Sequence, residues 1–238
     1  MIHFFKIILY QPLLNLLVFI YNIIPGHDLG LAIIILTIVI RLILWPLSQK
    51  AVHSQKALQA IQPKIKALQE KYKNDKQKLA RAMIEIYRES KVNPFSSFFI
   101  LLIQLPILIA VYQVFRTGLS EEVLPLYSFI TNPGTLNPYF FGLFNLGKPH
   151  LILALITGIF QYWQTKMLTT KLPANQISKT AGAKDEGMLV IMNRQMNFIM
   201  PIFTVFIGLT LPSGIMLYWL VGLILTIIQQ KTTLLKKL

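Results

Sequence analysis

Arg41 is the residue with the clearest capacity for chemistry, because it lies inside an otherwise apolar stretch from Leu29 to Pro46. The only other interruption of that stretch is Thr37, four residues earlier, which a helix would place on the same face. A charged arginine within a bilayer costs about 2.5–3.5 kcal/mol on insertion scales, so it normally faces a water-filled cavity or a partner. The sequence therefore indicates an electrostatic site for negatively charged groups.

An alternative for Arg41 is that its side chain extends to the nearer membrane surface. Leu47, at the end of the apolar stretch, is less than two helical turns away, so the distance permits this. Helical side chains tilt toward the helix N-terminus, however, and that direction leads deeper into the bilayer. We therefore favour a buried guanidinium while leaving the alternative open.

Isolated polar or amphipathic residues also occur in the other apolar stretches. The set comprises Ser96, Ser97, Gln104, Thr157, Gln161, Asn197, Thr204, Tyr218 and Trp219. Each alone is explained by a hydrogen bond between helices, or by an aromatic belt in the case of tryptophan. If they converge on Arg41, the interior of the helix bundle is a wet, positively charged groove.

Other kinds of site are not indicated. The chain has no cysteine, which excludes a disulfide framework, a thiol nucleophile and a thiolate metal site. Apart from Lys166, in the polar end of the stretch 151–167, no Asp, Glu, Lys or His lies inside an apolar stretch, and His53 and His150 are at the edges. A hydrolase or a cation-coupled transporter normally needs such groups within the membrane. We therefore expect a protein that is not an enzyme and that uses no cofactor or metal ion.

The net charge of +14 is distributed unevenly along the 238 residues. Charged residues make up only 13% of the chain and apolar residues 54%, which does not suit a soluble basic protein or a specific nucleic-acid binder. The segments 48–94 and 164–195 and the C-terminal tail carry 19 basic residues, the opposite side carries three, and Arg41 is the remaining one. The positive-inside rule makes the first side cytoplasmic, with the N-terminus outside and the C-terminus in the cytoplasm.

Five apolar stretches are long enough to predict membrane spans, for which a helix needs about 20 residues. Residues 1–28 predict an interfacial helix on the external side, with a sixth span or an uncleaved signal as alternatives. The predicted fold class is an all-α polytopic membrane protein with five transmembrane helices, the N-terminal interfacial helix and a cytoplasmic antiparallel helical hairpin. The spans are 29–47, 95–115, 151–167, 196–211 and 214–228, and the segments between and after them are the hairpin 48–94, the external loop 116–150, the cytoplasmic loop 168–195 and the cytoplasmic tail 229–238.

The hairpin prediction rests on an apolar seam at spacings of three and four residues, which is typical of paired helices. The seam consists of Leu58, Ile61, Ile65, Leu68 and Tyr72. Asn74 and Asp75 suit a turn and a helix N-cap, and Pro63 is expected to kink the first helix. A solvated charged loop that only fixes topology is the alternative. The basic residues of this segment also suit contact with anionic lipids.

Several short motifs in order around Arg41 resemble a known family. The first span contributes Gly30-Leu31-Ala32-Ile33-Ile34, Thr37, Arg41 and Pro46-Leu47; the hairpin and second span contribute Lys71-Tyr72, Asp75, Tyr87, Val92-Asn93-Pro94 and Gln104-Leu105-Pro106; the last hairpin contributes Leu211-Pro212-Ser213-Gly214 and Leu217-Tyr218-Trp219. From about Gln11 to Gln230 the chain is similar to the YidC-type membrane protein insertases, in a short bacterial form without a large periplasmic domain.

The resemblance implies a five-helix core in the bacterial inner membrane, with a hydrophilic groove that is open to the cytoplasm and to lipid. It implies that Arg41 receives the acidic or polar N-terminal tail of a nascent membrane protein, with Thr37, Gln104, Gln161 and Trp219 as its groove neighbours. The hairpin corresponds to the family's mobile recruitment hairpin. The ribosome and the Sec translocon are further partners in the family, although the short tail makes tail-mediated ribosome binding an open question. The expected function is insertion and folding of small membrane proteins; the alternative is an anion-conducting channel or transporter that uses the same arginine.

Overall fold

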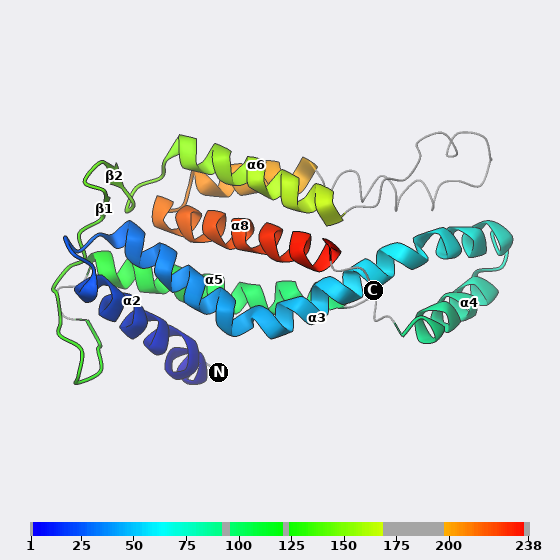
Figure 1. Cartoon of the computed structure of the whole chain (residues 1–238), viewed down its shortest axis with the longest axis horizontal. Helices are drawn as coiled ribbons and strands as arrows, with labels where there is room; N and C mark the ends of the chain where they lie inside the picture. The colour runs from blue at the N-terminus through cyan, green and yellow to red at the C-terminus, as the bar shows by residue number, and fades with distance from the viewer. Residues whose placement is uncertain (1, 92–95, 121–123, 169–197, 236–238) are drawn as a thin grey trace.

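The computed structural model describes residues 2–91, 96–120, 124–168 and 198–235. Apart from a pair of two-residue strands, the regular structure in these ranges is helical, and several helices are apolar enough to lie in a membrane (Figure 1). The prediction of an all-α polytopic membrane protein is thereby confirmed. Residues 169–195 of the predicted cytoplasmic loop lie outside the described residues.

The longest helix, α3, joins the membrane bundle to the hairpin without a break. It runs from Leu29 to Lys71 over 43 residues, so it combines the predicted first span with the first helix of the hairpin. Pro46 and Pro63 both lie inside it and neither ends it. A proline removes one backbone hydrogen bond, which bends a helix more readily than it stops one that is packed on both sides. Figure 1 shows that α3 changes direction partway along its length.

The second helix of the hairpin, α4, runs from Lys76 to Glu89 and folds back along α3 (Figure 1). Asp75 is its N-cap, because its carboxylate accepts a hydrogen bond from the backbone N–H of Lys78 at 3.0 Å. Ile61 and Ile65 of the apolar seam are buried between the two helices. They pack against Ala57, Leu58, Met83, Ile86 and Tyr87. The segment is therefore a folded hairpin and not a solvated loop.

The bundle is built around α8, which runs from Ser213 to Leu235. One side of α8 packs on α3, and the other packs on α6, Leu151–Leu168 (Figure 1). The apolar helix Phe198–Gly208 precedes α8 across the turn at Pro212. Helix α5, Ser96–Ser120, packs on α3 but makes few direct contacts with α8. As a result, α5 and α8 are joined mainly through the contacts that each makes with α3.

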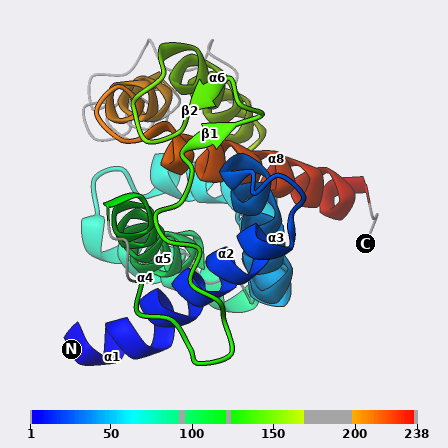
Figure 2. The same ribbon diagram turned by 90° about the vertical axis from the view of Figure 1, so that its left-hand side faces the viewer.

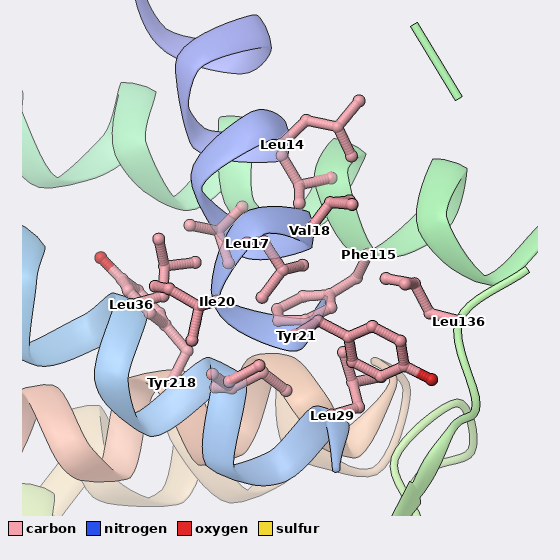
Figure 3. Packing of buried hydrophobic residues seen from close by; sticks show 14 of the residues in the cluster. Leu14, Leu17, Val18, Ile20, Tyr21, Leu29, Leu36, Phe115, Leu136 and Tyr218 are labelled. Carbon is pink, nitrogen blue, oxygen red and sulfur yellow. The ribbon is translucent and has the colours of Figure 1, made fainter. Parts of the chain in front are cut away.

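The N-terminal segment forms one helical stretch that lies obliquely across the bundle (Figure 2). It consists of α1 (Ile2–Phe5), the π-helical turn η1 (Lys6–Tyr10) and α2 (Gln11–Ile23). One face of α2 is buried against α3 and α5, as Leu17, Ile20 and Phe115 show in Figure 3. Residues His3–Ile23 are also long and apolar enough to cross a bilayer. The interfacial position and the sixth span therefore both stay predictions.

The segment 124–150 closes one end of the bundle. Its short strands β1 (Tyr139–Phe140) and β2 (Phe144–Asn145) pair antiparallel. The backbone N–H groups of Tyr127 and Asn137 donate to Asn15 and Tyr21 of α2, so the loop is tied to that helix. A Cβ at Gly30 would come within 2.0 Å of the Phe140 ring, so glycine is required where β1 crosses α3. The end of the bundle opposite the hairpin is therefore covered.

Asp28 joins this cover to the start of α3, and its removal is predicted to loosen both. One carboxylate oxygen accepts from the N–H of Leu31 at 2.8 Å, and the other accepts from the N–H of Phe141. Asp28→Ala is expected to lower the stability of the folded chain by about 2 kcal/mol, because a helix cap and a charged hydrogen bond are both lost. Thermal unfolding of the purified protein in detergent measures this. Asp75→Ala, which removes a cap far from the loop, is the control and should leave Phe141 protected from hydrogen exchange.

The cap at Asp75 predicts a pH dependence of the hairpin. The backbone N–H and the ammonium group of Lys78, the latter 3.0 Å away, hold the pKa of Asp75 below its usual value. The stabilisation is complete above the unfolded pKa of about 3.9 and is lost as the pH falls through the lower folded pKa. Hydrogen exchange of the first turn of α4 should therefore accelerate in that acidic range. In Asp75→Asn, whose capping side chain does not titrate, hydrogen exchange should not accelerate in this pH range. An equal acceleration in Asp75→Asn would show that titration of Asp75 is not its cause.

Candidate functional site

The guanidinium of Arg41 lies between α3 and α8, directly against a glycine. A Cβ added at Gly222 would lie 2.8 Å from Nη2 and 3.3 Å from Nε of Arg41. Any larger residue at this position would therefore displace the end of the arginine side chain. The residue is intermediate in exposure, and its guanidinium lies against α8. Whether it stays within the bilayer or reaches the membrane surface remains a prediction.

Tyr218 brings a third helix to this position. It is one turn before Gly222 on α8, is 2% exposed, and lies close enough to Arg41 for the two groups to interact electrostatically. Gln104 from α5 lies within hydrogen-bonding reach of the Tyr218 hydroxyl. The Tyr218 ring also belongs to the buried apolar cluster near Leu36 (Figure 3). Arg41, Tyr218 and Gln104 thus form a polar centre at which α3, α5 and α8 meet.

A small cavity lies beside Arg41 on the side of the bundle nearer the hairpin. Its volume is about 30 Å³, and it is lined by Ile38, Arg41, Leu42, Trp45, Leu225 and Gln229. A polar cavity of more than about 10–15 Å³ accommodates a water molecule, so this one suits one or two waters and no larger group. Arg41 and Gln229 supply the polar lining that such waters need.

Gln229 continues the polar contacts from the cavity toward the hairpin. It is buried on α8, its amide N–H donates to the carbonyl of Trp45 at 3.2 Å, and its carbonyl accepts from the Ser48 hydroxyl at 2.7 Å. Both partners are on α3, so a polar seam between α3 and α8 follows the path from Arg41 to the basic hairpin. The neighbouring Gln230 has a buried side-chain oxygen without a hydrogen-bond partner among the described residues.

Arg41 has no acidic partner in the described part of the chain, where the one recorded ion pair joins Lys78 to Asp75. The same ranges hold no group of three or more His, Cys, Asp or Glu side chains that could bind a metal ion. The centre is therefore a lone cation with neutral polar neighbours. Such a centre attracts negative charge.

The five residues expected at the site have different recorded contacts, and a common site for all five stays a prediction. Arg41 and Gln104 are brought together through Tyr218. Thr37 is fully buried, and its hydroxyl donates to the carbonyl of Ile33 in its own helix at 2.6 Å. The Gln161 amide donates to Gln164 and Thr165 on α6. Trp219 is half-buried on α8, next to Tyr218 in sequence but on a different face of the helix.

Gly222 and Gln229 were not considered for the site from the sequence, and Tyr218 was considered only as one of the polar residues that could converge on Arg41. Tyr218, Gly222 and Gln229 are spaced by four and seven residues, so they share one face of α8. That spacing is the feature of the sequence from which their common position could have been predicted. Gln229 was overlooked because the last span was expected to end at residue 228, whereas α8 continues to Leu235.

The sequence profile of the 60Kd inner membrane protein family matches residues 19–237. The chain belongs to this family. The match covers the helices that build the polar centre, from α3 through α5 to α8, and it confirms a multi-pass protein of the bacterial inner membrane.

Curated relatives agree with this family. Proteins named membrane protein insertase YidC from Geobacter sulfurreducens and Tolumonas auensis are each 33% identical over 220 residues, which is 92% of this chain and 36% and 35% of their own lengths. The relative of the same name from Geotalea daltonii is 32% identical over 220 residues. The resemblance to YidC-type proteins is therefore confirmed. The chain spans about a third of the length of these relatives.

Water access to the polar centre is testable with single cysteines, because the chain contains none. A thiol reacts with a maleimide only where water allows its ionisation. Cys at Gln104 should react with a membrane-impermeant maleimide added on the hairpin side of the membrane, and not from the other side. Cys at Leu105, which is exposed on the outer face of the same helix, is the control and should stay unreactive in lipid. Equal reactivity of the two positions would contradict a hydrated centre.

Proposed function

We propose that this chain is an insertase and folding chaperone for small membrane proteins, working through a hydrophilic groove centred on Arg41. The family relatives carry the name membrane protein insertase YidC, and the family match covers residues 19–237 of this chain. The observation that carries the proposal is a lone buried guanidinium, held by Gly222 and Tyr218 without an acidic partner in the described ranges.

The negative charge that Arg41 lacks would come from the substrate. A substrate with an acidic or polar N-terminal tail reaches Arg41 part-way across the bilayer, so the apolar distance that the tail must cross becomes shorter. Attraction between the carboxylates of the tail and the guanidinium is much stronger in a low dielectric than in water. A membrane potential of 100 mV adds about 2.3 kcal/mol for each acidic charge that moves outward.

Release follows from the packing of the helices around the centre. Helices α5 and α8 both pack on α3 but contact each other little, and α5 and α6 carry exposed apolar faces. A substrate helix that enters beside Arg41 therefore leaves sideways into lipid, where its apolar side chains are buried. The cavity of about 30 Å³ is too small for a helix, so insertion requires α5 and α8 to separate around α3.

The two ends of the bundle would have different roles. The 19 basic residues of the hairpin side assign that side to the cytoplasm, and the covered end to the exterior. Substrates then enter from the hairpin side along the seam of Ser48 and Gln229, and the loop 124–150 prevents leakage at the other end. The exposed basic residues of α4 recruit nascent chains and rest on anionic lipids. The ribosome and the Sec translocon are further partners within this proposal.

The decisive experiment compares Arg41→Ala with Arg41→Lys in cells depleted of their own insertase. Arg41→Ala should abolish insertion of a single-span protein with an acidic tail, whereas Arg41→Lys should retain part of it, because a lysine keeps the charge but not the planar fork of donors. Insertion is scored by protease protection of the tail. The matched substrate has the same apolar helix and a neutral tail, and its insertion should be much less affected.

Full activity of both variants with the acidic substrate would remove Arg41 from the mechanism. The same proteins, reconstituted in liposomes, distinguish the rival function of an anion channel or transporter. An insertase should show no anion flux that depends on Arg41 at constant pH. Flux that is present in the wild type and lost in Arg41→Ala would favour the channel.

A further inference from the structure

A second cavity lies at the covered end of the bundle, beside the first turns of α8 and before the part of α8 that contacts Arg41. Its volume is about 150 Å³, and it is enclosed by the β1–β2 hairpin, α6 and the first turns of α8. The lining includes Phe140, Phe144, His150, Ile152, Ile156 and Leu217. An apolar cavity of about 150 Å³ is large enough to bind a benzene-sized hydrocarbon. The space is therefore sufficient for a hydrocarbon ligand.

The backbone groups around the cavity are already paired, so they would not hold water. The carbonyl of Leu146 accepts from the N–H of Gly214 at 2.9 Å, and that of Lys148 accepts from the N–H of Ser213 at 3.0 Å. The Ser213 hydroxyl donates to the carbonyl of Asn145 at 3.2 Å. A water molecule needs two to four polar partners to remain in a cavity. The occupant that fits these walls is consequently apolar.

The cavity opens on the lipid-facing side of α6. Ile152 is 61% exposed and Ile156 is 38% exposed although both line the cavity, and Leu151 and Leu155 extend the same exposed apolar surface. In a membrane, the hydrocarbon in contact with this surface is a phospholipid acyl chain. Lipid tails are as apolar as the cavity wall, so the hydrophobic effect does not favour entry of an acyl chain from the bilayer. The favourable free energy of entry comes from dispersion contacts between the acyl chain and the wall, which replace an empty space.

Selectivity for one kind of lipid must then come from the headgroup. Lys148 is exposed and lies in sequence between Leu146 and His150, which both line the cavity. In the predicted topology it is one of three basic residues on the external side, with Lys6 and Arg116. A lysine beside the opening of an acyl-chain cavity suits a phosphate-bearing headgroup with net negative charge.

We propose that this cavity is a binding site for an anionic phospholipid, whose acyl chain enters between β2 and α6 while its headgroup contacts Lys148. In the orientation proposed above, the lipid belongs to the outer leaflet. The site is separate from Arg41 and does not depend on the insertase function. It would hold the β-hairpin against α6 and α8 and so support the cover of the bundle.

The test uses the full chain reconstituted in vesicles with traces of phosphatidylglycerol or phosphatidylcholine, each carrying a photoreactive diazirine at the end of one acyl chain. Cross-links are located by peptide mass spectrometry. In the wild type, phosphatidylglycerol should label the start of α6 and β2 severalfold more than phosphatidylcholine does. Equal labelling by the two lipids, or labelling spread evenly over the lipid-facing helices, would overturn the proposal.

Two matched pairs of variants separate the acyl-chain cavity from the headgroup contact. Ile156→Trp fills the cavity and should reduce labelling severalfold, whereas Leu155→Trp adds the same ring to the exposed face outside it and should not. Lys148→Gln should remove the preference for phosphatidylglycerol, whereas Arg116→Gln should leave it. If Ile156→Trp does not fold, Ile152→Trp serves instead, because that side chain is 61% exposed. Unchanged labelling in the cavity-filling variant, or an unchanged preference in Lys148→Gln, would contradict the assignment.

Discussion

The constraint that shapes this protein is the accommodation of one guanidinium inside a helix bundle that otherwise buries apolar side chains. The side chain of Arg41 is too large and too polar to pack closely between α3 and α8 without adjustment. Gly222 lacks a side chain and so leaves room for Nη2. Tyr218 of α8 and Gln104 of α5 provide polar groups near the guanidinium. Among the described residues, no carboxylate neutralises the charge of Arg41. The free energy of burying that charge is therefore not fully offset within the chain, and a negatively charged ligand would offset more of it.

The rest of the bundle differs between its two ends in a way that suits this centre. At one end, Asp28, Asn15 and Tyr21 tie the loop 124–150 down by hydrogen bonds to its backbone. At the other, buried polar groups of α8 meet α3 beside the basic hairpin. This difference between the two ends suits the access from one direction that the proposed function requires. The family assignment gives that asymmetry a biological setting in the inner membrane.

Much of this architecture was predictable from the sequence. The apolar runs, the seam containing Ile61 and Ile65, and the cap at Asp75 depend on local periodicity, which one chain displays directly. Arg41 was conspicuous for the same reason. The partners of Arg41 were harder to predict, because a glycine in an apolar span and a tyrosine among many aromatics acquire meaning only when α3 and α8 are aligned. Gln161 and Thr37 were expected at the site on polarity alone; both donate hydrogen bonds within their own helices, and their place at the site stays a prediction.

The continuity of α3 has a mechanical consequence. The helix starts at the covered end, passes Arg41 and ends at the tip of the hairpin, a length of about 65 Å for its 43 residues. A hydrogen-bonded helix of this kind resists twisting, so in the proposed function a partner that pulls or turns the hairpin would also apply torque at Arg41. Pro46 and Pro63 both lie between Arg41 and the tip of the hairpin, and each removes one backbone hydrogen bond, so the helix bends most readily at these two positions. Under the proposed function, binding at the hairpin and exposure of the Arg41 charge would therefore be connected through one continuous helix.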